Sequence, residues 1–117
     1  MVFLSPEEDY FTVELRGEDL QATRRVYAYT DAAGLNRLFA RLAEYERPWT
    51  AEESWESLEG EFLLSASCSP LGIVTFLAAI YGSPGAPEEW HVSASITTEL
   101  GQLPSIAAGA KRFFGGA

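Results

Sequence analysis

Residues 61–98, EFLLSASCSPLGIVTFLAAIYGSPGAPEEWHVSASITT, contain three strand-like segments in a row. Residues 61–68, 72–81 and 90–98 are rich in aliphatic, aromatic and β-branched side chains, which favours strands of this length. The connections SPLG and GSPGAP are short, and strands joined by short turns pair antiparallel. The stretch therefore predicts three neighbouring antiparallel strands.

Apolar and polar residues alternate along the last of these segments. Successive residues of a strand point to opposite faces, so one face carries Trp90, Val92, Ala94 and Ile96 and the other carries His91, Ser93, Ser95 and Thr97. A sheet buried on both faces would not alternate in this way, so we expect helices on one face only. Because Trp90 is the largest residue on the apolar face, we expect Trp90→Ala to destabilise the fold more than Trp55→Ala.

The start of the chain predicts a hairpin. Residues 10–16, YFTVELR, alternate as a strand does, and residues 20–29 return after a turn at Gly17. The returning strand places Arg25, Tyr27 and Tyr29 on its polar face. Residues 1–9 are expected to form a loose N-terminal arm.

Two helices are predicted from apolar residues at three- and four-residue spacing. The first follows the N-cap candidates Thr30 and Asp31 and ends at Pro48, and its stripe is Leu35, Leu38, Phe39, Leu42 and Tyr45. The second begins near Pro104, and its stripe is Ile106, Ala107, Ala110, Phe113 and Phe114. The order is ββαβββα, which we interpret as one α+β domain over residues 1–117. It would be a five-stranded antiparallel sheet with two helices packed on one face.

Composition argues against several classes of partner. Seventeen acidic residues against eight Lys and Arg give a formal net charge of −9, and such a protein is repelled by phosphate backbones, so we expect no nucleic-acid partner. The longest apolar run, residues 73–81, is too short to cross a membrane as a helix. The chain has no basic segment of the kind that opens a secretory signal, and one cysteine suits a reducing compartment. We therefore expect a cytoplasmic protein without a membrane partner.

The acidic residues are concentrated in residues 44–61. Seven glutamates lie there, opposed only by Arg47: Glu44, Glu46, Glu52, Glu53, Glu56, Glu59 and Glu61. One interpretation is a solvated surface that keeps the protein soluble. The other is a docking surface for a basic protein, in which Glu52, Glu53, Glu56 and Glu59 are the candidate contacts.

Catalytic and metal-binding patterns are missing from the sequence. One histidine and one cysteine do not supply a zinc site, so we expect no metal and no cofactor. His91 could pair with Cys68, Ser93 or Ser95, but no third group is placed to orient the histidine. We therefore expect no catalytic residue. Because Tyr and Arg are favoured at protein interfaces, the open sheet face is a candidate binding surface, with Arg25, Tyr27, Tyr29, His91, Ser93 and Ser95 as contacts.

Several short segments together resemble a known family. They are WESLEG (55–60), GIV (72–74), WHVSASI (90–96), ELGQL (99–103) and FF (113–114). The family consists of small bacterial proteins of unknown function, and the resemblance covers roughly residues 10 to 114. Its members carry a histidine–aspartate pair at the turn and a histidine after the glycine, where this chain has Cys68, Ser69 and Ile73. The departure implies that any chemistry of that polar cluster is absent here. The small, acidic, single-domain form is also similar to that of immunity proteins of bacterial toxin systems.

These observations lead to three functional hypotheses. The first is a non-enzymatic cytosolic binding protein of unknown protein partner, immunity-like in neutralising that partner by direct binding. The alternative is a small enzyme or small-molecule-binding domain with a pocket between sheet and helices, for which His91, Cys68 and Tyr27 are candidates. The third is a homodimer joined through strand edges or sheet faces.

Overall fold

A computed structural model describes residues 1–4, 6, 9–28, 32–82, 85, 87 and 89–114. The described residues form two antiparallel sheets and two α-helices. Sheet A has the order β1-β2-β3, formed by Val2–Leu4, Tyr10–Arg16 and Gln21–Tyr27. Sheet B has the order β4-β5-β6-β7, formed by Glu53–Glu56, Phe62–Cys68, Ile73–Tyr81 and His91–Glu99. Helix α1 is Ala32–Ala43, and the 3₁₀ turn η1 (Leu100–Gln102) leads from β7 into α2, Leu103–Phe114.

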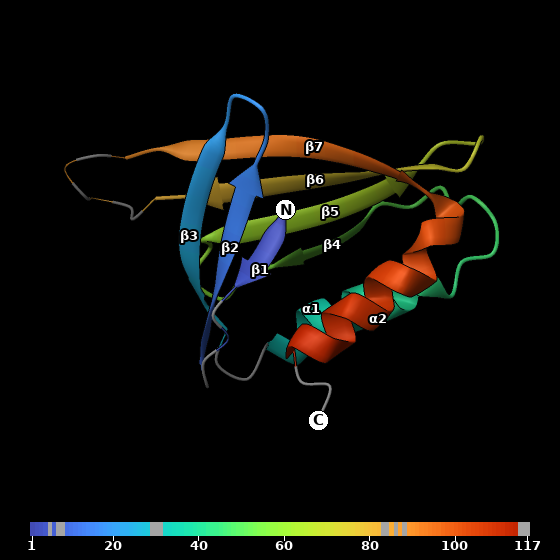
Figure 1. The fold of residues 1–117 in the computed structure, drawn as a ribbon, viewed down its shortest axis with the longest axis horizontal. Coiled ribbons are helices and arrows are strands. Elements are labelled where there is room, and N and C mark those ends of the chain that lie inside the picture. The colour runs from blue at the N-terminus through green and yellow to red at the C-terminus, as the bar shows by residue number, and fades with distance from the viewer. Residues whose placement is uncertain are drawn as a thin grey trace.

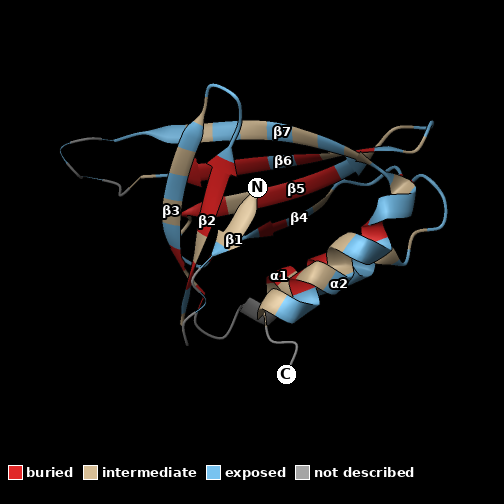
Figure 2. Ribbon diagram, viewed as in Figure 1, coloured by how far each residue is buried: buried red, intermediate tan, exposed pale blue. Residues whose placement is uncertain are grey.

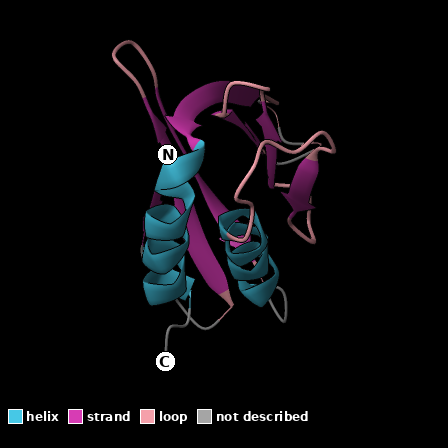
Figure 3. Ribbon diagram, turned by 90° about the vertical axis from the view of Figure 1, so that its right-hand side faces the viewer, coloured by secondary structure: helices cyan, strands magenta, loops and turns pink. Residues whose placement is uncertain are grey.

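Sheet A and the two helices lie on the same face of sheet B. In Figure 1, sheet A crosses one end of sheet B, and α1 and α2 lie side by side near the other end. Figure 3 shows the two helices next to each other from the side. The other face of sheet B has no helix over it within the described part of the chain, and Ser93 and Ser95 on that face are exposed. The prediction that helices cover one face only is confirmed.

One hydrophobic core fills the space between these layers. Figure 2 shows the buried positions concentrated on β2, β5, β6 and the inward sides of the helices. Both helical stripes pack against the core, with Leu35, Leu38 and Leu42 of α1 almost completely buried. However, α1 ends at Ala43 and not at Pro48, so Tyr45 lies beyond the helix. The largest fully buried side chains are Phe62, Leu15, Leu35, Leu38, Leu42, Leu64, Ile80 and Leu103. The proposed helix caps Thr30 and Asp31 lie outside the described residues.

The prediction of one five-stranded sheet is wrong. All five predicted strands exist, but β3 joins sheet B through side chains instead of a ladder of backbone bonds. The Arg24 Nε–H donates to the Tyr81 carbonyl at 2.7 Å, and the Tyr27 backbone N–H donates to the Glu61 carboxylate at 2.8 Å. Where β3 crosses sheet B, these bonds give its polar groups hydrogen-bond partners without strand pairing. The hairpin therefore packs across sheet B and does not extend it.

Two short strands were not predicted. Residues 1–9 were expected to be a loose arm, but Val2–Leu4 pair with residues 12–14 of β2. Phe3 contacts five other phenyl rings at centroid distances of 5.1–6.2 Å, those of Phe11, Phe39, Phe62, Phe113 and Phe114. Because aromatic side chains bury large areas, these contacts and the pairing with β2 hold the segment against the core.

The expected ranking of two tryptophans is reversed. Trp55 lies on the unpredicted strand β4, where it is only 9% exposed and packs on Phe62 at a ring distance of 6.1 Å. Trp90 is 37% exposed, because the β6–β7 end of sheet B projects past sheet A (Figure 1). Its indole lies where a Cβ on Gly82 would be, 2.7 Å from Nε1, so it covers a turn and does not enter the core.

Candidate functional site

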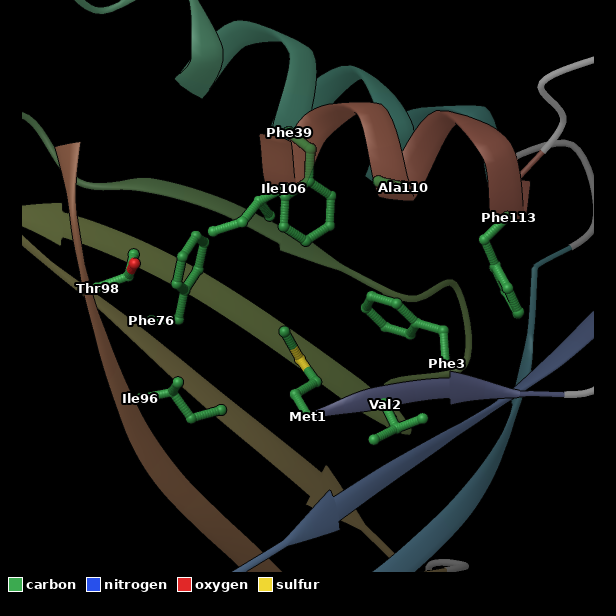
Figure 4. Close-up of a pocket in the computed structure, with 11 residues that line it drawn as sticks. Met1, Val2, Phe3, Phe39, Phe76, Ile96, Thr98, Ile106, Ala110 and Phe113 are labelled. Atoms are coloured by element: carbon green, nitrogen blue, oxygen red, sulfur yellow. The ribbon is translucent and has the colours of Figure 1, made fainter. Parts of the chain in front are cut away.

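An apolar pocket lies between the helices, β1 and the inner face of sheet B. Its volume is about 460 Å³, within the range of about 300–1,000 Å³ typical of small-molecule sites. Figure 4 shows the lining side chains pointing toward a common space under α2. They are Met1, Val2, Phe3, Phe39, Phe76, Ile96, Thr98, Ile106, Ala110 and Phe113, with Gly109 completing the wall.

The helical wall follows from the spacing of residues in α2. Ile106, Ala110 and Phe113 are separated by four and three residues, so they lie on one face of the helix. Between them Gly109 presents no side chain, and a Cβ there would meet nothing closer than 3.8 Å. Small residues at the centre of this face and large ones at its ends leave the space that forms the pocket.

The opposite wall comes from two neighbouring strands and from β1. Phe76 of β6 pairs with Ile96 of β7, and Thr98 follows Ile96 on the same inward face. Phe3 closes the pocket between α1 and α2, with ring centroids 6.2 Å from Phe39 and 5.9 Å from Phe113. The short strand β1 is therefore both part of the fold and a wall of the pocket.

The chemistry of the lining is that of a binding site for apolar groups. Thr98 carries the one hydroxyl among the lining side chains, at one end of the space in Figure 4. No lining side chain is ionisable, so none of these side chains can act as a general acid, a general base or a charged nucleophile. The pocket can remove the apolar surface of a ligand from water. This burial is favourable by about 25 cal/mol for each Å² of apolar surface.

The residues predicted for the polar sheet face separate into two places. Arg25 and Tyr27 lie on the solvent side of sheet A with Tyr10, which sequence reasoning missed. The Arg25 guanidinium carbon is 4.5 Å from the Tyr10 ring centroid, and the Tyr10 and Tyr27 rings are 5.2 Å apart. This contact is a cation–π interaction beside a tilted aromatic pair. Tyr29 lies outside the described residues.

His91, Ser93 and Ser95 lie in one exposed row on the outer face of sheet B. The His91 ring stacks on Tyr81, its partner across the strands, at 5.8 Å. Cys68 pairs with Val74 at the other end of β6, seven residues from Tyr81, the partner of His91; at the rise of a strand this separation is about 23 Å. The two residues therefore cannot form a catalytic pair, and neither they nor Tyr27 line the pocket.

The candidate acidic contacts lie on and beside β4. Glu52, Glu56 and Glu59 are exposed, whereas Glu53 forms an ion pair with Arg41 of α1. Within the described residues, no group of three or more His, Cys, Asp or Glu side chains is placed to hold a metal ion. The helices in that part of the chain include none with the length and apolar character needed to span a bilayer.

A model of the family DUF6228, described as a family of unknown function, matches residues 3–117. The chain belongs to DUF6228. The resemblance inferred from the sequence is thus confirmed at the level of a family without a known function, but the likeness to immunity proteins has no support. Neither the curated proteins nor the solved structures gave a match. The DUF6228 match begins at Phe3, so it covers all the pocket-lining residues except Met1 and Val2.

Only some of the pocket residues could be predicted from the sequence. The stripe Ile106, Ala110 and Phe113 was predicted, as was the inward face that carries Ile96. The contribution of β1 was missed, because three apolar residues before a proline do not distinguish a strand from an arm. Phe3 could have indicated that this segment is packed against the core, because leaving a large aromatic side chain in water is unfavourable.

Proposed function

We propose that this protein is a non-enzymatic binding protein that takes a small apolar molecule into the pocket between sheet B, β1 and α2. The observation that carries the proposal is a space of about 460 Å³ lined almost entirely by apolar side chains. A site of this size with few polar groups is typical of ligand-binding proteins. The absence of ionisable side chains from the lining supports binding over catalysis.

The lining also limits the ligand. Four phenyl rings and two isoleucines favour a ring system or a branched hydrocarbon body. Thr98 can donate one hydrogen bond and accept others, so a single hydroxyl or carbonyl oxygen is best placed at that end. A charged group inside the pocket would lack a partner, and burying it unpaired is unfavourable.

The test compares two isoleucine-to-tryptophan substitutions in the same sheet. Ile96→Trp fills the pocket, whereas Ile73→Trp alters the exposed outer face. With the neutral fluorophore phenylnaphthylamine as the probe, we expect the wild type and Ile73→Trp to bind with similar dissociation constants. We expect Ile96→Trp to weaken binding at least about tenfold, because the added ring occupies the ligand's volume.

Thermal melts of the same variants show whether Ile96→Trp is folded. Equal fluorophore binding by a folded Ile96→Trp and by the wild type would contradict the proposal, as would no binding by the wild type.

Protein binding is a second candidate function, favoured by the cluster of Tyr10, Arg25 and Tyr27. Tyr10 is 39% exposed, and exposed Tyr and Arg together are typical of interface hot spots. The exposed glutamates Glu52, Glu56 and Glu59 would suit a basic partner. The test is capture of a partner protein from a lysate of the native cell. If this function is correct, the wild type captures a partner that Tyr10→Ala no longer binds. Leu71→Ala, a change at another exposed apolar site, should still bind that partner.

A further inference from the structure

Strand β7 is a free edge of sheet B. Its nine residues pair with β6 along their whole length, and no other described strand pairs with it. The Trp90 carbonyl accepts from the Gly82 N–H, and the Leu100 N–H donates to the Gly72 carbonyl. Even-numbered residues therefore direct their backbone groups toward β6, and odd-numbered residues from His91 to Glu99 direct theirs away from the sheet.

This edge lacks the features that normally prevent strand pairing. Edge strands are commonly protected by proline, lysine or a bulge. The sequence HVSASITTE contains no proline or lysine, and its unbroken register with β6 leaves no room for a bulge. The inward residues Val92, Ala94 and Ile96 are only half-buried, whereas Val74 and Ile80 of β6 are completely buried.

The other edge of sheet B is protected. Strand β4 and its flanks carry the exposed glutamates Glu52, Glu56 and Glu59. Two such edges brought together would place like charges opposite one another, which is destabilising. The acidic segment thus disfavours pairing through β4 and leaves β7 as the edge of sheet B that is open to a partner.

We propose that two copies of this chain form a dimer by antiparallel pairing of β7 with β7, around a two-fold axis at Ser95. This register uses the whole strand and brings together only residues whose backbone groups point outward. Ser95 then faces Ser95 of the second copy, Ser93 faces Thr97, and His91 faces Glu99. The strand is complementary to itself, because a two-fold axis repeats the imidazole–carboxylate pair at both ends.

A second copy fits this edge better than an unrelated strand. On the outer face, hydroxyl side chains of one copy lie opposite hydroxyl side chains of the other. On the inner face, Ala94 of one copy lies opposite Ile96 of the other. The outer face of the joined sheet therefore stays polar and the inner face stays apolar. The dimer does not depend on the ligand pocket. His91, Ser93 and Ser95 would all contact the second copy across the β7–β7 interface.

Proline substitutions test the pairing. In Ser95→Pro the lost N–H points away from β6, so the chain keeps its own ladder but loses the centre of the dimer. In the matched control Ala94→Pro the lost N–H points toward β6, which should lower the melting temperature. We expect sedimentation equilibrium to show a wild-type dimer and a folded Ser95→Pro monomer.

Exchange of charges tests the register. His91→Glu places two glutamates opposite one another at each end, and should weaken the dimer about tenfold. Adding Glu99→Arg to this variant places opposite charges at each end and should recover the affinity, whereas Glu56→Arg on β4 should leave the dimer unchanged.

A wild-type chain that stays monomeric from micromolar to millimolar concentration would overturn the proposal. So would binding of an extended peptide along β7 by a monomeric chain, or a dimer unaffected by both Ser95→Pro and His91→Glu.

Discussion

Replacement of Trp55 by alanine is expected to lower the free energy of unfolding by about 3–5 kcal/mol, the usual cost of deleting a buried tryptophan. Trp55 is 9% exposed and packs on Phe62 between β4 and the rest of the core. A domain of this size has about 5–15 kcal/mol of stability in total. Urea denaturation should therefore show a much lower midpoint, and the variant should express poorly.

Trp90→Ala is the matched control. Trp90 has the same side chain but is 37% exposed over the Gly82 turn, so we expect a loss of only about 1 kcal/mol. Equal losses for the two variants, or a larger loss for Trp90→Ala, would show that β4 does not close the core.

Replacement of Glu61 by alanine is expected to cost about 3 kcal/mol, because it removes a buried charged acceptor and leaves its donors unsatisfied. The Glu61 carboxylate accepts from the Tyr27 backbone N–H at 2.8 Å and from the Ser57 hydroxyl at 2.7 Å. Ser57 Oγ in turn accepts from the Phe62 N–H. One side chain thus joins sheet A to the turn before β5.

Glu59→Ala supplies the comparison for Glu61→Ala. Glu59 is an exposed glutamate in the same turn, and its removal should change stability by less than about 0.5 kcal/mol. Hydrogen exchange at the Tyr27 amide should accelerate in Glu61→Ala only. Unchanged exchange at that amide would mean that the carboxylate does not hold the two sheets together.

Elements with a strong hydrophobic period could be predicted from the sequence. The inward face of β7 and the stripes of both helices follow from residue spacing alone, and the five long strands lie within two residues of their predicted bounds. Polarity was also informative, since His91, Ser93 and Ser95 are exposed as expected. These features depend on local chain geometry, which the sequence records directly.

The rest depends on contacts between distant segments. Strand β4 contains one apolar residue, Trp55, and its burial results from the approach of α1 and β5. The bond that joins the two sheets, from the Tyr27 N–H to the Glu61 carboxylate, connects residues that are 34 positions apart in the sequence. Glu61 was counted with the acidic surface because a charged residue is usually exposed, and nothing local indicates the partners that allow it to be buried.

Methyl NMR can show whether the space beneath α2 binds an apolar molecule. The chain has four isoleucines, of which Ile96 and Ile106 line the pocket. Ile80 is fully buried elsewhere in the core and Ile73 is exposed on the outer face. Titration with phenylnaphthylamine should shift the methyl signals of Ile96 and Ile106 and leave that of Ile73 in place. Shifts confined to Ile73, or no saturable shift at Ile96 and Ile106, would contradict the assignment of the pocket as the binding site.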